Sequence, residues 1–309
     1  MKKLATLLPS FALLLCLAAC GDSETPNVSV KAPDTPQNSE DVGDSDSQGN
    51  NDKVTNQIIF DGLVAVDNEE CTIKISEINP DDMWGFSLKT ELENKSAEKT
   101  YMFSIQSAAI NGVQCEPLFA NEVAPGKKAN DKISFSSSSL KENGIGDYTD
   151  IELTFRVYDS DDWFAESVAK ETIHVYPYGE DKAVTFVRET QPSDNVIADN
   201  EYVTAIVTGY ENNTIWGYTV KLFLLNKTED KNVMFSVNDA SVNGYMADPF
   251  FATSVSAGKC AFSSMSWSDN TLQENGINEV SEIEFVLRVY DADNWFDDEF
   301  FNDTVILNP

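Results

Sequence analysis

A loop rich in oxygen-bearing side chains occurs twice in the 309-residue chain, each time ending in a tryptophan. The first copy reads Tyr-Asp-Ser-Asp-Asp-Trp over residues 158–163, and the second reads Tyr-Asp-Ala-Asp-Asn-Trp over residues 290–295. Calcium prefers six to eight oxygen ligands with negative charge nearby, so acidic residues alternating in a tight loop could bind it. The candidate ligands are Asp159, Asp161, Asp162, Asp291, Asp293 and Asn294. The alternative is a hairpin turn, in which the same side chains accept backbone hydrogen bonds.

Aromatic side chains form the second kind of candidate site, because a flat ring can stack on a sugar or anchor a protein partner. The candidate ligand-binding residues are Trp163, Trp295, Phe250 and Phe251. Duplicated tryptophans more often belong to a core, however. We expect Trp84 and Trp216, which each precede a glycine, to lie between two sheets.

Catalysis is not indicated. The chain contains a single histidine, His174, and the matching position of the second copy is Ile306. A nucleophile, a base and an orienting group therefore cannot be drawn from both copies. We expect a protein that is not an enzyme and has no cofactor, with calcium as the one candidate ion.

The N-terminus has the pattern of a lipoprotein signal peptide. Two lysines precede an apolar run that ends Leu-Ala-Ala-Cys at Cys20. About 15 apolar residues are too few to span a membrane permanently, and small residues before the cysteine admit a peptidase. We expect cleavage after residue 19 and lipid on Cys20, which would anchor the protein stably on the outer face of the cell membrane. An ordinary secretory signal and an uncleaved anchor are the alternatives.

The balance of charge is strongly acidic. The chain has 52 acidic and 21 basic residues, which gives a formal net charge of -31. A surface of this sign repels phosphate backbones, so nucleic acid is excluded as a partner. Solubility of a displayed protein explains the charge equally well.

Three cysteines remain for the folded part, Cys71, Cys115 and Cys260. Their spacing is not that of a metal site. An exported protein could join Cys71 to Cys115, but valine and alanine occupy the matching positions of the second copy. We favour buried thiols over a disulfide.

The segment from residue 20 to 56 is rich in Ser, Asp, Asn, Gly and Pro and has few large apolar side chains. It cannot bury enough surface to offset the entropy of ordering its backbone. We expect a disordered, acidic tether.

The rest of the chain is a tandem duplication. With a constant offset of 132 residues, residues 64–177 align without a gap to residues 196–309. Roughly 40 % of positions are identical from the first aligned tryptophans onward, which chance does not produce. This period is too long for a solenoid, so each copy should be a domain with its own core. We place the first repeat at residues 57–178 and the second at residues 179–309.

Within each repeat the apolar residues alternate with a period of two. Ile151, Leu153 and Phe155 point one way, and the polar residues between them point the other. Further strands are expected near residues 71–77, 84–92, 100–106, 129–136 and 171–176. Residues 183–187 read as the first strand of the second repeat, with 58–60 as its counterpart. Short helical turns are expected at 138–142 and 270–274. The fold class is all-β, as two tandem immunoglobulin-like antiparallel β-sandwich domains.

Several short motifs carry a resemblance to a known kind of protein. They include Asn94-Lys95, Asn111-Gly112, Gly126-Lys127 and the Arg-Val-Tyr-Asp segment that starts at Arg156. With these motifs the chain resembles uncharacterised tandem immunoglobulin-like repeat lipoproteins of Gram-positive, clostridia-like bacteria. The resemblance covers nearly all of both repeats. It implies the fold and the location, and no activity.

We therefore expect an extracellular lipoprotein, anchored to the membrane through Cys20, whose two modules bind a protein or a cell-wall glycan. Two alternatives stay open: a structural spacer without a ligand of its own, and an accessory subunit of an envelope enzyme or transporter. The sequence leaves the ligand, the angle between the domains and the oligomeric state undefined.

Overall fold

The computed structural model describes residues 57–309, apart from 84, 137–139, 142, 295 and 297–298. The predicted signal peptide, the predicted lipid site at Cys20 and the predicted tether at 20–56 lie outside the described residues, as do Trp84 and Trp295. No helix in the described ranges has the length and apolar character needed to cross a membrane.

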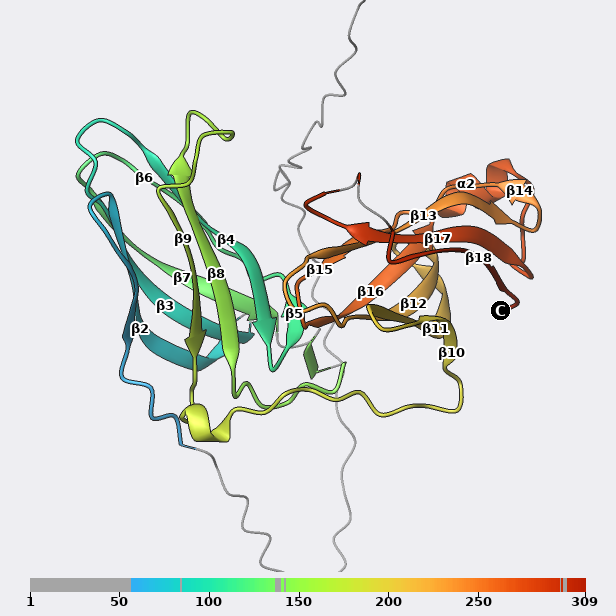
Figure 1. Cartoon of the computed structure of the whole chain (residues 1–309), viewed down its shortest axis with the longest axis horizontal. Helices are drawn as coiled ribbons and strands as arrows, with labels where there is room; N and C mark the ends of the chain where they lie inside the picture. The colour runs from blue at the N-terminus through green and yellow to red at the C-terminus, as the bar shows by residue number, and fades with distance from the viewer. Residues whose placement is uncertain (1–56, 84, 137–139, 142, 295, 297–298) are drawn as a thin grey trace, which may run out of the picture. The chain divides into compact units, whose positions relative to one another are not determined.

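The described chain is mostly β-structure, as predicted (Figure 1). The strands of the first repeat are β1 (Leu63–Asp67), β2 (Cys71–Asp82), β3 (Gly85–Asn94), β4 (Tyr101–Ile110), β5 (Val113–Cys115), β6 (Ala120–Val123), β7 (Lys128–Ser136), β8 (Ile151–Asp159) and β9 (Ala169–Val175). Those of the second are β10 (Asn195–Asp199), β11 (Val203–Thr214), β12 (Gly217–Asn226), β13 (Val233–Val242), β14 (Tyr245–Met246), β15 (Ala252–Val255), β16 (Cys260–Trp267), β17 (Ile283–Asp291) and β18 (Phe301–Leu307). The strands match pairwise at the offset of 132 residues found in the sequence.

Two antiparallel sheets belong to each repeat. In the first repeat, β1-β2-β3-β7 faces β5-β4-β8-β9, with β6 added to β4; in the second, β10-β11-β12-β16 faces β14-β13-β17-β18, with β15 added to β13. The alternation that predicted β8 is present, since Ile151, Leu153 and Phe155 are fully buried. Side chains of both sheets meet in one core cluster per repeat, which is a sandwich-like arrangement.

The two helical elements are short. The turn expected at 270–274 is present as α2 (Asp269–Glu274), and the hydroxyl of Ser268 caps it by accepting the N–H of Thr271. The turn expected at 138–142 falls largely on residues outside the described ranges. A 3₁₀ helix, η1 (Glu180–Lys182), follows the first repeat.

The strands predicted at residues 183–187 and 58–60 are not formed. Residues 179–194, which we name the connector, run from η1 to β10. The N–H of Phe186 donates to the carbonyl of Asn111 at 2.7 Å, and the N–H of Val184 donates to the Thr149 hydroxyl at 3.1 Å. Because single bonds to first-repeat loops satisfy these groups, the apolar alternation here reflects packing against the first core and not a strand.

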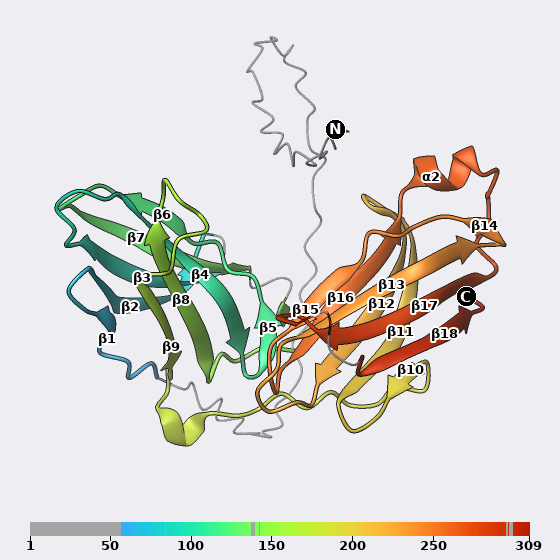
Figure 2. The ribbon, with the colours of Figure 1, turned by 45° about the horizontal axis from the view of Figure 1, so that its top comes forward.

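The two repeats touch within the compact unit Val54–Pro309. The start of β16 lies beside β5, where Cys260 and Val113 form a parallel bridge (Figure 2). Phe223 and Cys260 of the second repeat pack with the core cluster of the first.

Candidate functional site

The acidic loop after β8 is organised as a turn. The Asp159 carboxylate accepts the N–H of Asp161 at 3.2 Å and lies 3.2 Å from the ammonium of Lys99. The Asp162 carboxylate accepts the N–H of Phe164 at 3.1 Å. Backbone donors and a lysine thus occupy the oxygens that a cation would need.

The second loop, after β17, repeats this arrangement. The carboxylate of Asp291 accepts the N–H of Asp293 at 3.0 Å and lies 3.1 Å from the ammonium of Lys231. The backbone donor first, and the lysine next, hold the pKa of Asp291 below its usual range. The carboxylate of Asp293 accepts the side-chain amide of Asn232, and the N–H of Asn294 donates to the carbonyl of Asp291.

The predicted calcium ligands are therefore given other partners. Among the described residues there is no group of three or more His, Cys, Asp or Glu side chains that could hold a metal ion. Asp159 and Asp291 each face a lysine, which competes with a cation for the same carboxylate. The arrangement matches the hairpin alternative, in which Asp and Asn side chains stabilise a turn.

Trp163 packs on the outside of the same loop. Its ring meets Tyr158 edge-on with centroids 5.1 Å apart, and the Arg156 guanidinium lies 4.2 Å from the Tyr158 centroid. Arg156 also donates to the Trp163 carbonyl at 3.0 Å. The tryptophan remains largely exposed. It is held in place by its neighbours and keeps one face open to a ligand.

A second exposed aromatic surface lies at the turn between β11 and β12. Trp216 is 66 % exposed and Phe250 is 72 % exposed. Together with Ile215 they line a shallow hollow of about 240 Å³, whose polar wall includes Ser268, Asp269 and Asn270. We name Ile215, Trp216 and Phe250 the Trp216 surface. It combines apolar rings with nearby hydrogen-bonding groups, as ligand sites do.

Two local features build the Trp216 surface. Phe250 is fixed by a backbone bridge, donating to the Ser266 carbonyl at 2.8 Å and accepting the Ser266 N–H at 3.2 Å. Gly217 has φ +86, and a Cβ atom there would lie 2.1 Å from the carbonyl oxygen of Trp267. Only glycine allows this approach of β12 to β16.

The expectation that Trp216 lies between the sheets is wrong. It lies in the turn before Gly217, and its N–H donates to the Thr214 hydroxyl at 3.1 Å. The core position is taken by Trp267, which is 1 % exposed and donates its indole N–H to the Ala247 carbonyl at 2.8 Å. Phe251 is half-buried and packs against the second core, unlike Phe250.

The first repeat presents an equivalent surface. Met83 matches Ile215 and is 82 % exposed, while Leu118 matches Phe250 and is 77 % exposed. Leu118 forms the same pair of backbone bonds, here with Ser134. Sequence reasoning missed Met83, Leu118 and Ile215, although their apolar character at matched turn positions of both repeats was the available signal.

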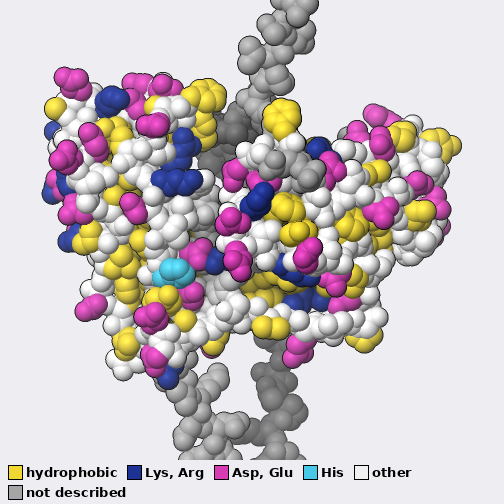
Figure 3. All heavy atoms as spheres, in the orientation of Figure 1, with side chains coloured by type: hydrophobic (Ala, Val, Ile, Leu, Met, Phe, Trp, Pro, Cys, Tyr) yellow, Lys and Arg dark blue, Asp and Glu magenta, His cyan; other side chains and the backbone are white. Residues whose placement is uncertain are grey.

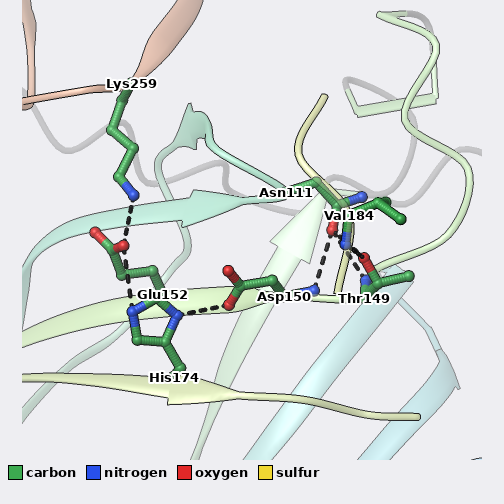
Figure 4. Close-up of polar contacts among 7 residues, drawn as sticks. All are labelled: Asn111, Thr149, Asp150, Glu152, His174, Val184 and Lys259. Carbon is green, nitrogen blue, oxygen red and sulfur yellow. Dashed lines mark hydrogen bonds and ion pairs between the residues drawn. The ribbon is translucent and has the colours of Figure 1, made fainter. Parts of the chain in front are cut away.

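A polar cluster joins the two repeats (Figure 4). His174 on β9 lies with Nδ1 2.7 Å from the Asp150 carboxylate and with Nε2 3.5 Å from that of Glu152 on β8. Glu152 also pairs with the ammonium of Lys259 in the second repeat at 2.5 Å. Opposite charges thus hold the repeats together at this point, and the histidine has a positioning role.

The three cysteines of the described residues are free thiols. Burial raises the pKa of the Cys71 and Cys260 thiols to about 11, and that of Cys115 to about 12. They are protonated at neutral pH, so they pack as small apolar groups.

Comparison with known proteins gives no family. The sequence matches no protein-family model, and no curated protein matches it significantly.

Proposed function

We propose that the chain is a lipid-anchored extracellular protein whose two repeats each bind a protein or a cell-wall glycan. One observation carries the proposal. Turn positions of both repeats expose large apolar side chains at matched places, Met83 and Leu118 in one and Ile215 and Phe250 in the other. Exposed apolar groups that recur at equivalent sites of a duplicated fold favour a binding surface over chance exposure.

The charge of the surroundings narrows the ligand. Acidic side chains are spread over the visible face of the described residues in Figure 3, and the hollow of the Trp216 surface contains Asp269. A polyanion is therefore repelled, whereas an uncharged sugar or an apolar protein segment is not. Asp269, Asn270 and Ser268 offer the hydrogen bonds that a hydroxyl-rich or amide-rich ligand requires.

The test is retention on isolated cell envelope. Labelled protein spanning residues 54–309 is compared with a Trp216→Ala/Phe250→Ala variant and with a Val64→Ala/Val187→Ala control, in which two other exposed valines are truncated. We expect the first variant to lose most retention and the control to keep it. Treating the envelope with a protease or with a wall-glycan hydrolase separates the two ligand classes.

A structural spacer is the second candidate, and the contact between the repeats favours it. Glu152 and Lys259, together with the bridge between β5 and β16, fix the repeats against each other, as a rigid stalk would need. A spacer has no ligand, so equal and low retention of all three proteins would support it and contradict the binding proposal.

A further inference from the structure

The contact between the repeats consists of an edge on the first and a strand start on the second. The N–H of Cys260 donates to the Gly112 carbonyl at 3.1 Å. The Gln114 amide bonds to the Ser254 carbonyl at 2.6 Å and to the N–H of Ser256 at 3.0 Å. The ion pair between Glu152 and Lys259 closes the contact (Figure 4).

Because the repeats share one register, each half of this contact exists a second time. The edge recurs in the second repeat as Gly244, Tyr245 and Met246, and Glu284 takes the place of Glu152. The strand start recurs in the first repeat as the Gly126-Lys127 turn before β7. These second halves cannot meet within one chain, since each repeat already uses its other side.

The free edge on the second repeat is exposed and more apolar than its covered counterpart. Tyr245 and Met246 are exposed where the first repeat has Val113 and Gln114, and Ile306 is exposed where it has His174. A polar residue would be expected at each of these positions if water alone covered them. The edge thus has the character of a contact surface.

The two free halves carry opposite charges. Lys127 and Glu284 are both exposed, and neither side chain forms a hydrogen bond or ion pair within the described part of the chain. They match Lys259 and Glu152, which pair within the chain. Charge and position therefore agree.

We propose that a second copy of this chain binds the free edge, with its Gly126-Lys127 turn on β14. The N–H of Lys128 donates to the Gly244 carbonyl, and the ammonium of Lys127 pairs with Glu284. The two surfaces differ, so the contact is heterologous and builds head-to-tail rows. Lateral display on a membrane would favour such rows by raising the local concentration.

One difference between the two contacts sets the strength of the second. Within the chain, Phe262 packs against Phe186 of the connector, with ring centroids 5.9 Å apart, and against Phe223 at 5.4 Å. The first repeat has Asn130 and Glu91 at those positions, where no connector is available to cover an aromatic ring. The chain-to-chain contact keeps the edge part and lacks the aromatic part. It should therefore be weak, with a dissociation constant between about 10 µM and 1 mM.

Complementary charge variants test this contact. Residues 54–309, the compact unit that contains both cores, are studied by sedimentation velocity as the wild type, Glu284→Lys and Lys127→Glu. Each variant alone faces like charges and should remain monomeric where the wild type associates. An equimolar mixture restores opposite charges at every contact and should associate like the wild type. Association should weaken with added salt.

The control is a Lys170→Glu and a Glu201→Lys variant, which make the same charge changes at exposed positions away from both surfaces. They should associate like the wild type, alone and mixed. A wild type that is monomeric up to about 1 mM, or a mixture of the two test variants that stays monomeric, would overturn the proposal. Neither result bears on retention by the envelope, which depends on the Trp216 surface.

Discussion

Two tryptophans of the second repeat have opposite environments although they lie within the same part of the fold. Trp216 is in the turn before β12 and is exposed, whereas Trp267 at the end of β16 is 1 % exposed and hydrogen-bonded. Exposed rings contribute little to folding, while a buried ring contributes through its area and packing.

Truncating the two rings should therefore have different effects on stability. We expect Trp216→Ala to change the free energy of unfolding by less than about 0.5 kcal/mol and Trp267→Ala to lower it by about 3 to 5 kcal/mol. Denaturant unfolding followed by circular dichroism measures both. A loss of more than about 2 kcal/mol for Trp216→Ala would show that its ring is part of the fold and not a binding surface.

A buried ion pair makes stability depend on pH. Arg188 binds the Asp194 carboxylate with two bonds of 2.7 and 2.6 Å, and this arginine lowers the pKa of Asp194 from 3.8 to about 2. A depressed pKa means that the folded state favours the charged carboxylate. The contribution is complete above about pH 4 and is lost as the pH falls toward 2.

Substitution of Asp194 by asparagine should remove this dependence. We expect Asp194→Asn to lower the free energy of unfolding at pH 7 by about 1.5 to 3 kcal/mol, because Arg188 loses a charged partner. Between pH 4 and 2 the difference from the wild type should shrink. A constant difference across this range, measured by thermal unfolding, would show that the pair is not the cause.

At the scale of the element, glycine is required at one turn and only preferred at another. Gly217 and Gly258 both have positive φ, but only at Gly217 would a Cβ atom collide, at 2.1 Å from the Trp267 carbonyl oxygen. Nothing lies within 4 Å of a Cβ atom at Gly258.

The two positions form a matched pair of substitutions. Gly258→Ala should cost about 1 to 2 kcal/mol through backbone strain alone. Gly217→Ala should cost at least about 2 kcal/mol more, because β12 and β16 must separate. Thermal melting of both variants is the measurement. Similar losses would contradict the close approach of the two strands at Trp267.

Sequence patterning predicts these elements well where local chemistry decides them. The Asn-Lys motif is an example, since the Asn94 amide donates to the Lys99 and Val123 carbonyls, and Asn226 does the same at the matched positions. The offset of 132 residues then transfers every strand from one repeat to the other. Alternation fails at 183–187, because a connector that packs on a core has the same pattern as a strand.

The candidate site was less predictable than the strands. The turn at the end of β11 places Trp216 outside, and this depends on the φ of one glycine and on the backbone of a strand distant in sequence. The acidic loops were ambiguous for a similar reason. Whether Asp159 and Asp291 bind a cation or a lysine depends on Lys99 and Lys231, which only the fold brings near.

At the scale of the whole molecule, the duplication has two consequences. It supplies two equivalent apolar surfaces, and it leaves one edge and one strand start without a partner inside the chain. The first consequence predicts avidity, because a ligand held by one repeat meets the other at high effective concentration. A spacer gains only length from the same duplication.

Binding to a dense envelope ligand by variants of one or both repeats tests the central claim most directly. The variants are Met83→Ala/Leu118→Ala, Trp216→Ala/Phe250→Ala and the combination of all four. We predict that disabling either repeat lowers the apparent affinity by about 10²-fold or more and that disabling both abolishes binding. Affinity unchanged by either single-repeat variant would contradict the claim that the two repeats are equivalent binding modules.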